Sequence, residues 1–326
     1  MNSSNESTTE EYDLIPISVK FWFYLIFLIP SISCSIVILS YILSNRTLRK
    51  ALHYHAVIIF LLISLIYDVT IYPWMIYLYY HEGIWSRNEL FCTVWIFIDW
   101  GLYYTQIILF AWATIERHIL IFHSTWIITR RQRLVIHYCP LFFLITYCLL
   151  YYTLTIFFPP CQNHHDDYYY LCLKPCLFDR ASLYSYDTIV HQISPNLIII
   201  IFSILLLLRI RQQKIRIGKS LRWRKHWKMT VQLLFISILY LVFALPIAFF
   251  NFLHLCGVEE SLIFNVMEYL LFFNYLAMLF CPFSCALSLP QLRNQVRKCV
   301  RFDTTRRTIA PTLRTIPQAL ENETAV

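Results

Sequence analysis

Residues 90–119 read LFCTVWIFIDWGLYYTQIILFAWATIERHI, an apolar stretch in which Asp99, Glu116 and Arg117 are the charged residues. About 20 apolar residues in helical form cross a bilayer, and a helix satisfies all its backbone N–H and C=O groups within its own segment. Six further stretches of similar character surround this one. The seven predicted spans are residues 19–43, 55–80, 90–119, 135–158, 188–208, 229–255 and 262–289. The sequence therefore predicts an all-α, seven-transmembrane helix bundle.

The composition excludes a water-soluble domain. Hydrophobic residues make up 58% of the chain and charged residues 14%, whereas soluble domains carry about 25% charged residues. The first span lacks the basic head of a signal peptide and has the full length of a spanning helix. We therefore expect it to remain in the mature protein.

The distribution of Lys and Arg predicts the orientation, because short cytoplasmic loops are enriched in these residues. The loops after spans one, three and five are basic, and the opposite loops and the N-terminal segment are mainly acidic. The basic residues are Arg46, Arg49, Lys50, Arg130, Arg131, Arg133, Arg209, Arg211, Lys214, Arg216, Lys219, Arg222, Arg224, Lys225 and Lys228. We expect the N-terminus outside and the C-terminus in the cytoplasm. The net charge of +8 is then explained by attraction to anionic membrane lipid, without nucleic acid.

The segments outside the spans carry several modification and binding motifs. Residues 1–18 form an extracellular tail with N-glycosylation sequons at Asn2 and Asn5. Residues 19–289 form the membrane domain, and residues 290–300 read as a short amphipathic eighth helix on the membrane surface, with Cys299 as a palmitoylation site. Residues 301–326 form a disordered cytoplasmic tail whose end, Thr324 to Val326, has the form of a PDZ-domain ligand.

The eleven cysteines are too scattered for a metal cluster, so we predict no metal site. Most of those within spans are expected to pack as small apolar side chains. Four lie in or beside the outer loops, where disulfides persist: Cys92, Cys161, Cys172 and Cys176. Their connectivity does not follow from the sequence alone.

The chain resembles rhodopsin-like (class A) G-protein-coupled receptors over all seven spans. Cys92 opens the third span and Arg117 lies 25 residues later (117 − 92 = 25), which is the family's separation between its disulfide cysteine and its motif arginine. Trp85, seven residues before Cys92, matches the family's first outer loop. Three prolines occupy its helix-bending positions: Pro195, Pro246 and Pro282.

The resemblance implies a disulfide from Cys92 to the second outer loop, residues 159–187. Cys176 is the expected partner, with Cys161 and Cys172 left to form a second bridge, although all three loop cysteines are candidates. The loop would then form a lid over a ligand pocket. The resemblance also implies a plasma-membrane receptor without a cofactor. The partners implied are an extracellular ligand, a heterotrimeric G protein and arrestin.

The Glu116-Arg117-His118 segment corresponds to the family's Asp/Glu-Arg-Tyr motif. The resemblance implies that Glu116 restrains Arg117 at rest, and that movement of the helices frees Arg117 for the G protein, with Pro246 and Pro282 as hinges. This is a two-state latch. The alternative is a pair of interfacial charges that reach toward water.

Asp99 lies seven residues after Cys92, within apolar surroundings in the outer half of span three. An unpaired carboxylate there is costly, so it requires a partner or a proton. In the resembled family, this position pairs with cationic amines and some peptides, and Tyr275 occupies the place of a supporting tyrosine. Trp95 and Tyr103 are further expected pocket residues. The alternative is that Asp99 bonds only Tyr275 or another helix and has a packing role.

Several departures mark a divergent member. Ser35 and Ser64 stand where the family has Asn and Asp, Ala244 replaces a tryptophan, and the Asn-Pro-x-x-Tyr motif reads Cys281-Pro-Phe-Ser-Cys285. Because the usual carboxylate is missing and Asp68 lies one turn away, we predict no sodium site. Spans six and seven contain no Lys, which excludes a retinal Schiff base there.

A seven-helix transporter or channel is the competing class. Transporters tend to show repeated halves and charged pairs near the bilayer midplane. The sequence shows no internal repeat, and beyond Asp68 and Asp99 its midplane is nearly free of charge. No His, Asp and Glu set is arranged as an enzyme site, so we do not expect an enzyme.

Overall fold

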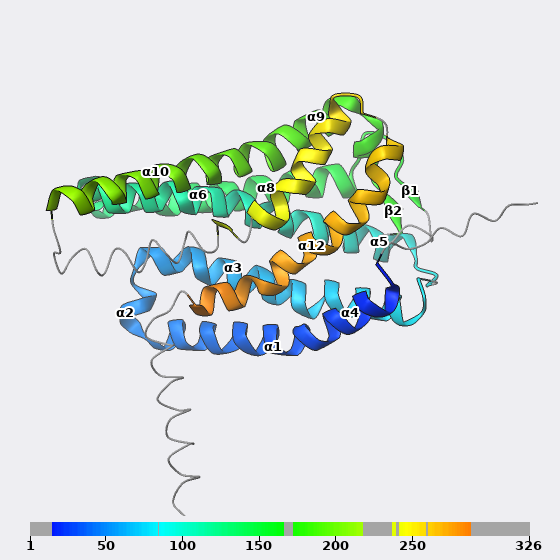
Figure 1. Ribbon diagram of the computed structural model, residues 1–326, viewed down its shortest axis with the longest axis horizontal. Coiled ribbons are helices and arrows are strands. Elements are labelled where there is room, and N and C mark those ends of the chain that lie inside the picture. Colours follow the sequence, from blue (N-terminus) through cyan, green and yellow to red (C-terminus); the bar gives the residue numbers. More distant parts are fainter. Residues whose placement is uncertain are drawn as a thin grey trace, which may run out of the picture. The chain divides into compact units, whose positions relative to one another are not determined.

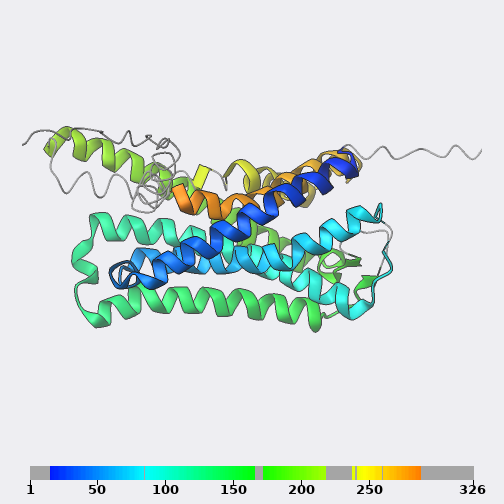
Figure 2. The same cartoon turned by 90° about the horizontal axis from the view of Figure 1, so that it is seen from below.

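The computed structural model describes residues 15–83, 85–165, 172–217, 237–238, 241–258 and 260–287. These residues form a bundle of long helices lying side by side (Figures 1 and 2). The first span is α1 (Ile17–Ser44), and the second consists of α3 (Leu52–Val69) and α4 (Ile71–Tyr80). The third consists of α5 (Glu89–Ile96), η1 (Phe97–Gly101) and α6 (Leu102–Phe122). The fourth consists of α7 (Arg130–Arg133), η3 (Leu134–Tyr138) and α8 (Cys139–Phe157). The last three comprise α9 (Ala181–Asp187) with η5 (Thr188–Ile193) and α10 (Ser194–Ile217), the helix Leu241–Leu255, and α12 (Glu260–Leu287).

The predicted all-α architecture is confirmed. Within the described residues, six helices are long and apolar enough to cross a membrane, and Leu241–Leu255 is a shorter apolar helix within the sixth predicted span. The short helix α2 (Arg46–Arg49) lies between the first and second spans, and the short helical segment η2 (Ser124–Ile127) lies between the third and fourth. Asn45 caps α2, since its side chain accepts hydrogen bonds from the backbone N–H groups of Thr47 and Leu48.

The helix α6 lies at the centre of the bundle. It packs against α3, α8 and α10, and α1 packs against α3, α4 and α12. Most residues of α6 are buried, whereas α8 exposes large apolar side chains such as Phe142, Phe143 and Leu150. Apolar side chains on the outside suit contact with lipid tails, because lipid provides no water for polar groups.

Three spans contain a widened, π-helical turn: η1 in the third, η3 in the fourth and η5 in the fifth. Such turns insert an extra residue into the helical repeat and are frequent at functional sites. Each of these turns carries a buried polar side chain, namely Asp99, His137 and His191. The turns therefore direct polar groups into the bundle.

The prolines of the family positions all lie within helices. Pro282 is inside α12 and Pro246 is inside Leu241–Leu255. Pro195 is the second residue of α10 and lies two residues after the end of the π-helical turn η5. Each lacks the N–H that would continue the helical ladder. Their role as hinges stays a prediction.

The outer loop between α8 and α9 contains a two-stranded antiparallel hairpin, β1 (His164–His165) and β2 (Leu173–Lys174), followed by η4 (Cys176–Asp179). His164 is opposite Lys174, and His165 is opposite Leu173. When this register is continued beyond the two strands, Cys161 and Cys176 lie near each other at the open end of the hairpin. Cys172 directly precedes β2, at its other end.

The disulfide pairing differs from the one predicted. Cys92 is bonded to Cys172, and Cys161 is bonded to Cys176, with a Cα–Cα distance of 5.6 Å in each pair. The prediction of Cys92 with Cys176 and Cys161 with Cys172 was wrong. The hairpin register decides the pairing, because it brings Cys176 back to Cys161, where the Asn163 side chain also accepts a hydrogen bond from the Cys176 N–H at 2.9 Å.

Several sequence predictions lie outside the described residues. These are the sequons at Asn2 and Asn5, the amphipathic helix at residues 290–300 with Cys299, and the tail ending in Thr324 to Val326. The basic loop over residues 218–236 is also outside them.

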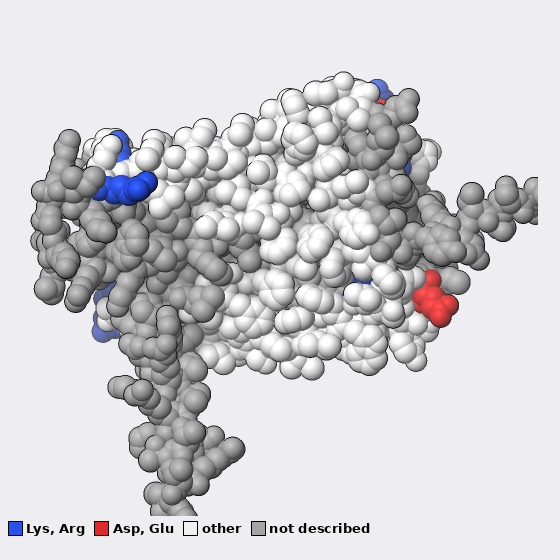
Figure 3. Space-filling model, viewed as in Figure 1, with Lys and Arg blue, Asp and Glu red and all other residues white. Residues whose placement is uncertain are grey.

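Charged side chains are concentrated at the two ends of the described bundle (Figure 3). On the face shown, Lys and Arg gather at the end where α2 and the last turns of α10 lie. A broad band with few charged side chains separates them from the opposite end, where acidic side chains and a few Lys or Arg side chains are visible. This band matches the hydrocarbon core that a membrane protein requires.

The disulfide assignment can be tested by peptide mapping of the intact, unreduced protein. We expect linked peptides that contain Cys92 with Cys172 and Cys161 with Cys176, because the hairpin register holds these cysteines together. Mass spectrometry before and after reduction is the measurement. A peptide linking Cys92 to Cys176 would contradict the assignment.

Candidate functional site

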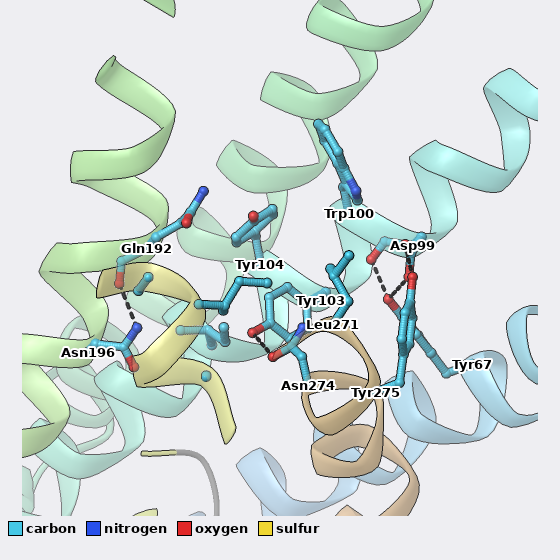
Figure 4. Close-up of a pocket in the computed structure, with 14 residues that line it drawn as sticks. Tyr67, Asp99, Trp100, Tyr103, Tyr104, Gln192, Asn196, Leu271, Asn274 and Tyr275 are labelled. Carbon is cyan, nitrogen blue, oxygen red and sulfur yellow. Dashed lines mark hydrogen bonds between the residues drawn. The ribbon is translucent and has the colours of Figure 1, made fainter. Parts of the chain in front are cut away.

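A cavity of about 50 Å³ lies among the third, fifth, sixth and seventh spans, with one residue from the second (Figure 4). Its walls are mainly aromatic and polar. They consist of Tyr67, Asp99, Trp100, Tyr103, Tyr104, Ile107, Gln192, Asn196, Ala244, Ile247, Ala248, Leu271, Asn274 and Tyr275. A concave site with convergent polar groups is the usual form of a ligand pocket.

Asp99 forms the acidic end of the cavity and is only 4% exposed. The Tyr275 hydroxyl donates to its Oδ2 atom at 2.7 Å, and the Tyr67 hydroxyl donates to Oδ1 (Figure 4). The structure thus brings together Asp99 and Tyr275, the pair singled out from the sequence, and adds Tyr67. No Lys, Arg or His among the described residues forms an ion pair with Asp99.

Tyr67 was missed because a tyrosine in an aromatic-rich span carries no distinctive sequence signal. It comes from α3, whereas Tyr275 comes from α12, so two neighbouring helices each supply one donor. A carboxylate that receives a hydrogen bond on each oxygen is much less costly to bury than a bare one. The site therefore holds its acid in place before any ligand arrives.

The other two predicted pocket residues have different places. Tyr103 lines the cavity, and its hydroxyl donates to Asn274 Oδ1 at 2.5 Å. Trp95 is fully buried in a separate aromatic cluster, where its ring contacts Trp74 and Trp85 and lies 5.6 Å from the Arg87 guanidinium. Trp95 does not line this cavity.

Amide groups form the end of the cavity opposite Asp99 (Figure 4). Asn196 donates to the Gln192 carbonyl at 2.8 Å, and its Oδ1 atom is buried without a partner among the described residues. The Gln192 side chain accepts from Asn251 at 2.6 Å, which links the fifth and sixth spans. A buried acceptor without a donor is costly unless a ligand or water completes it.

Behind this end lies a second buried acid, Asp187, which is 2% exposed. From the sequence it counted among the charges of the outer loop, but it belongs to α9 and faces the bundle. It accepts hydrogen bonds from Tyr152 at 2.7 Å, His191 at 3.0 Å and Gln192 at 3.3 Å. The spacing of Asp187 and His191 by four residues, one helical turn, is the signal that indicates their contact.

Glu116, Arg117 and His118 are all buried near the other end of α6, at 2%, 8% and 8% exposure. Among the described residues, the Nδ1 atom of His137 contacts Glu116 Oε1. The predicted restraint of Arg117 by Glu116 stays a prediction. The sequence carried no indication of the His137 contact, because His137 is one of many residues in an apolar span.

Asp68 is fully buried on α3, and the Ser31 hydroxyl lies 2.7 Å from its Oδ2 atom. Ser35 and Ser64 are also buried. Within the part of the chain that the structure describes, no group of three or more His, Cys, Asp or Glu residues has the arrangement of a metal site.

A bundle of membrane-length apolar helices with a polar cavity among them defines the class of polytopic helical membrane proteins. The chain matches the family described as 7 transmembrane receptor (rhodopsin family) over residues 17–285, and it therefore belongs to this family. It is a multi-pass G-protein-coupled signalling receptor, and members of this family are receptors rather than enzymes. No curated protein matches the chain.

Replacing Asp187 by Ala should destabilise the receptor strongly, because Tyr152, His191 and Gln192 would lose a shared acceptor. We expect a loss of at least about 3 kcal/mol, or a Tm lowered by roughly 6 °C or more. Thermal unfolding of the purified receptor is the measurement.

The matched control is Asp179→Ala. Asp179 pairs with His164 at 3.4 Å, and both side chains are well exposed, so this change should cost less than about 1 kcal/mol. Equal effects of the two changes would contradict a structural role for the Asp187 cluster.

Proposed function

We propose that this receptor binds a cationic ligand, an amine or a basic peptide, in the outer half of its bundle and activates a heterotrimeric G protein on the cytoplasmic side. The observation that carries the proposal is Asp99, a buried carboxylate at the cavity wall whose described partners are two neutral tyrosines. A ligand cation would supply the opposite charge that the described residues do not.

The chemistry of the walls supports a cation. Tyrosine hydroxyls stabilise a carboxylate without neutralising it, so Asp99 retains its attraction for a cation. Trp100, Tyr103 and Tyr104 surround it with aromatic rings, and such rings attract an ammonium or guanidinium group over their faces. A cation would therefore meet both the acid and the aromatic faces.

The size of the cavity bears on the ligand. A volume of about 50 Å³ has room for a few water molecules, and therefore for a compact cationic group. We infer that the head group of the ligand enters here and that the rest of it extends toward the disulfide-bonded outer loop. The unpaired Asn196 Oδ1 offers an acceptor for a donor on the ligand.

The proposal includes the orientation of the chain. The N-terminus lies outside and the C-terminus inside the plasma membrane, which is supported by the basic loops and by the distribution of charge in Figure 3. The Glu116-Arg117-His118 segment then lies at the cytoplasmic end, where Arg117 would contact the G protein. Arrestin, a PDZ protein and anionic lipid are further proposed partners on that side. Membership of the family favours this function over a transporter or channel.

Asp99→Asn should weaken binding of a cationic ligand by at least about 30-fold, because removing one charge of a buried pair costs about 2–5 kcal/mol. Cationic amines and basic peptides would first be screened on cells expressing the intact chain, and affinity would be measured for whichever ligand activates it. Surface expression is quantified in parallel.

Asp68→Asn is the matched control. Asp68 is an equally buried acid on α3, but it does not line the cavity. Its replacement should change affinity by less than about threefold. If Asp99→Asn left activation by the identified ligand unchanged, Asp99 would have a packing role only.

Arg117→Ala should abolish G-protein activation without loss of receptor from the cell surface, because the proposed contact with the G protein depends on the guanidinium. The measurement is nucleotide exchange on a panel of G proteins in membranes from expressing cells. Arg131→Ala removes a basic residue that is exposed on α7 and should retain most of the activity. Full signalling by the Arg117→Ala receptor would refute the proposed role.

A further inference from the structure

Three side chains and one backbone carbonyl form a continuous chain of hydrogen bonds at the inner end of the bundle. Glu116 Oε1 contacts His137 Nδ1, and His137 Nε2 lies 2.9 Å from His55 Nδ1. His55 Nε2 lies 3.0 Å from the carbonyl oxygen of Arg49. This chain of hydrogen bonds joins α6 to η3 of the fourth span, then to α3 of the second span, and finally to α2, which precedes the second span.

The number of protons in this chain follows from its end groups. The Arg49 carbonyl only accepts, so His55 Nε2 must carry a proton. Each of the two remaining bonds also needs one proton, which makes three protons for three bonds. Two neutral imidazoles supply two of them. The third therefore lies on Glu116 or makes one of the histidines an imidazolium.

Either distribution gives the three side chains a net charge of zero. Glu116 and His137 are 2% and 0% exposed, and a buried acid is tolerated where its charge is balanced and its oxygen is hydrogen-bonded. His137 provides both. Glu116 thus has a hydrogen-bond partner on another span, in addition to its charged neighbour Arg117.

The backbone explains why His137 reaches Glu116. His137 belongs to the π-helical turn η3, between Leu134 and Tyr138, and its ring packs against Tyr138 at 4.7 Å between centroids. The Tyr138 ring also lies 5.6 Å from the His55 ring. The two histidines are therefore fixed by packing as well as by hydrogen bonds.

We propose that His137, positioned by His55, is the side chain that holds Glu116 in the resting receptor, in the role that the family pattern assigns to the neighbouring arginine. This inference rests on the proposed coupling function for its signalling consequence. The pairing itself can be tested without any coupling. His137 is a positioning residue, since it acts on signalling through Glu116.

Two substitutions of His137 separate its two contacts. The Asn side chain places an amide at the position of the histidine Nδ1 atom and can still donate to Glu116. The Gln side chain places its amide near the position of Nε2, toward His55, and loses the donor to Glu116. Both variants are polar and uncharged, so a merely structural effect of losing the ring should be similar in the two.

The first experiment is a double-mutant cycle with Glu116→Gln and His137→Gln, measured as Tm of the purified intact receptor. His137→Gln alone should lower Tm by several degrees, because it leaves Glu116 buried without its partner. In the Glu116→Gln background the same change should cost much less, and His137→Asn should remain close to the original receptor. Additive effects, or equal effects of the Asn and Gln variants, would overturn the pairing.

The second experiment measures ligand-independent nucleotide exchange on the panel of G proteins, normalised to surface expression. His137→Gln should raise basal exchange at least about fivefold, the lower end of typical coupling between states, and His137→Asn should not. A coupled cycle in Tm with unchanged basal exchange would overturn the resting-state role. If no form of the receptor activated any G protein, the proposed function would fail, while the Tm cycle would still decide the pairing.

Discussion

The structure depends on one constraint, which is that an acid buried within a membrane bundle must find its hydrogen-bond donors on other helices. Asp68, Asp99, Glu116 and Asp187 are all at most 4% exposed. Each meets a donor from another span or another part of the bundle. Because lipid supplies neither water nor counter-ions, these contacts fix which helix faces which neighbour. The polar contacts therefore help to specify which helices are neighbours in the bundle.

The third span connects the two ends of the molecule. Its outer half carries Asp99 and its inner half carries Glu116. Asp99 contacts Tyr67 of the second span directly. Glu116 contacts His137, which in turn contacts His55 of the second span. The second and third spans are thereby joined at two levels. A ligand that changes the contacts of Asp99 would act on the same helix that carries the proposed coupling residues, which is the arrangement that a two-state receptor needs.

Much of the fold could be predicted from the amino-acid sequence. Apolar length indicated the seven spans, since backbone hydrogen bonding leaves no alternative to a helix in lipid. The spacing from Cys92 to Asp99 and Arg117 indicated which residues lie in the outer and inner halves of the third span. The disulfide pairing could not be predicted, because hairpin register rather than order along the chain brings Cys176 to Cys161 and leaves Cys172 for Cys92.

By itself, then, the sequence determined the class of the protein and the depth of the charged residues of the third span, because hydropathy and helical rise depend on local composition. Only the tertiary structure decided which partners those charges have. Tyr67 reaches Asp99, and His137 reaches Glu116, because separate helices pack together and because π-helical turns change the direction in which Asp99 and His137 point. Such contacts between distant residues leave no local pattern in the chain.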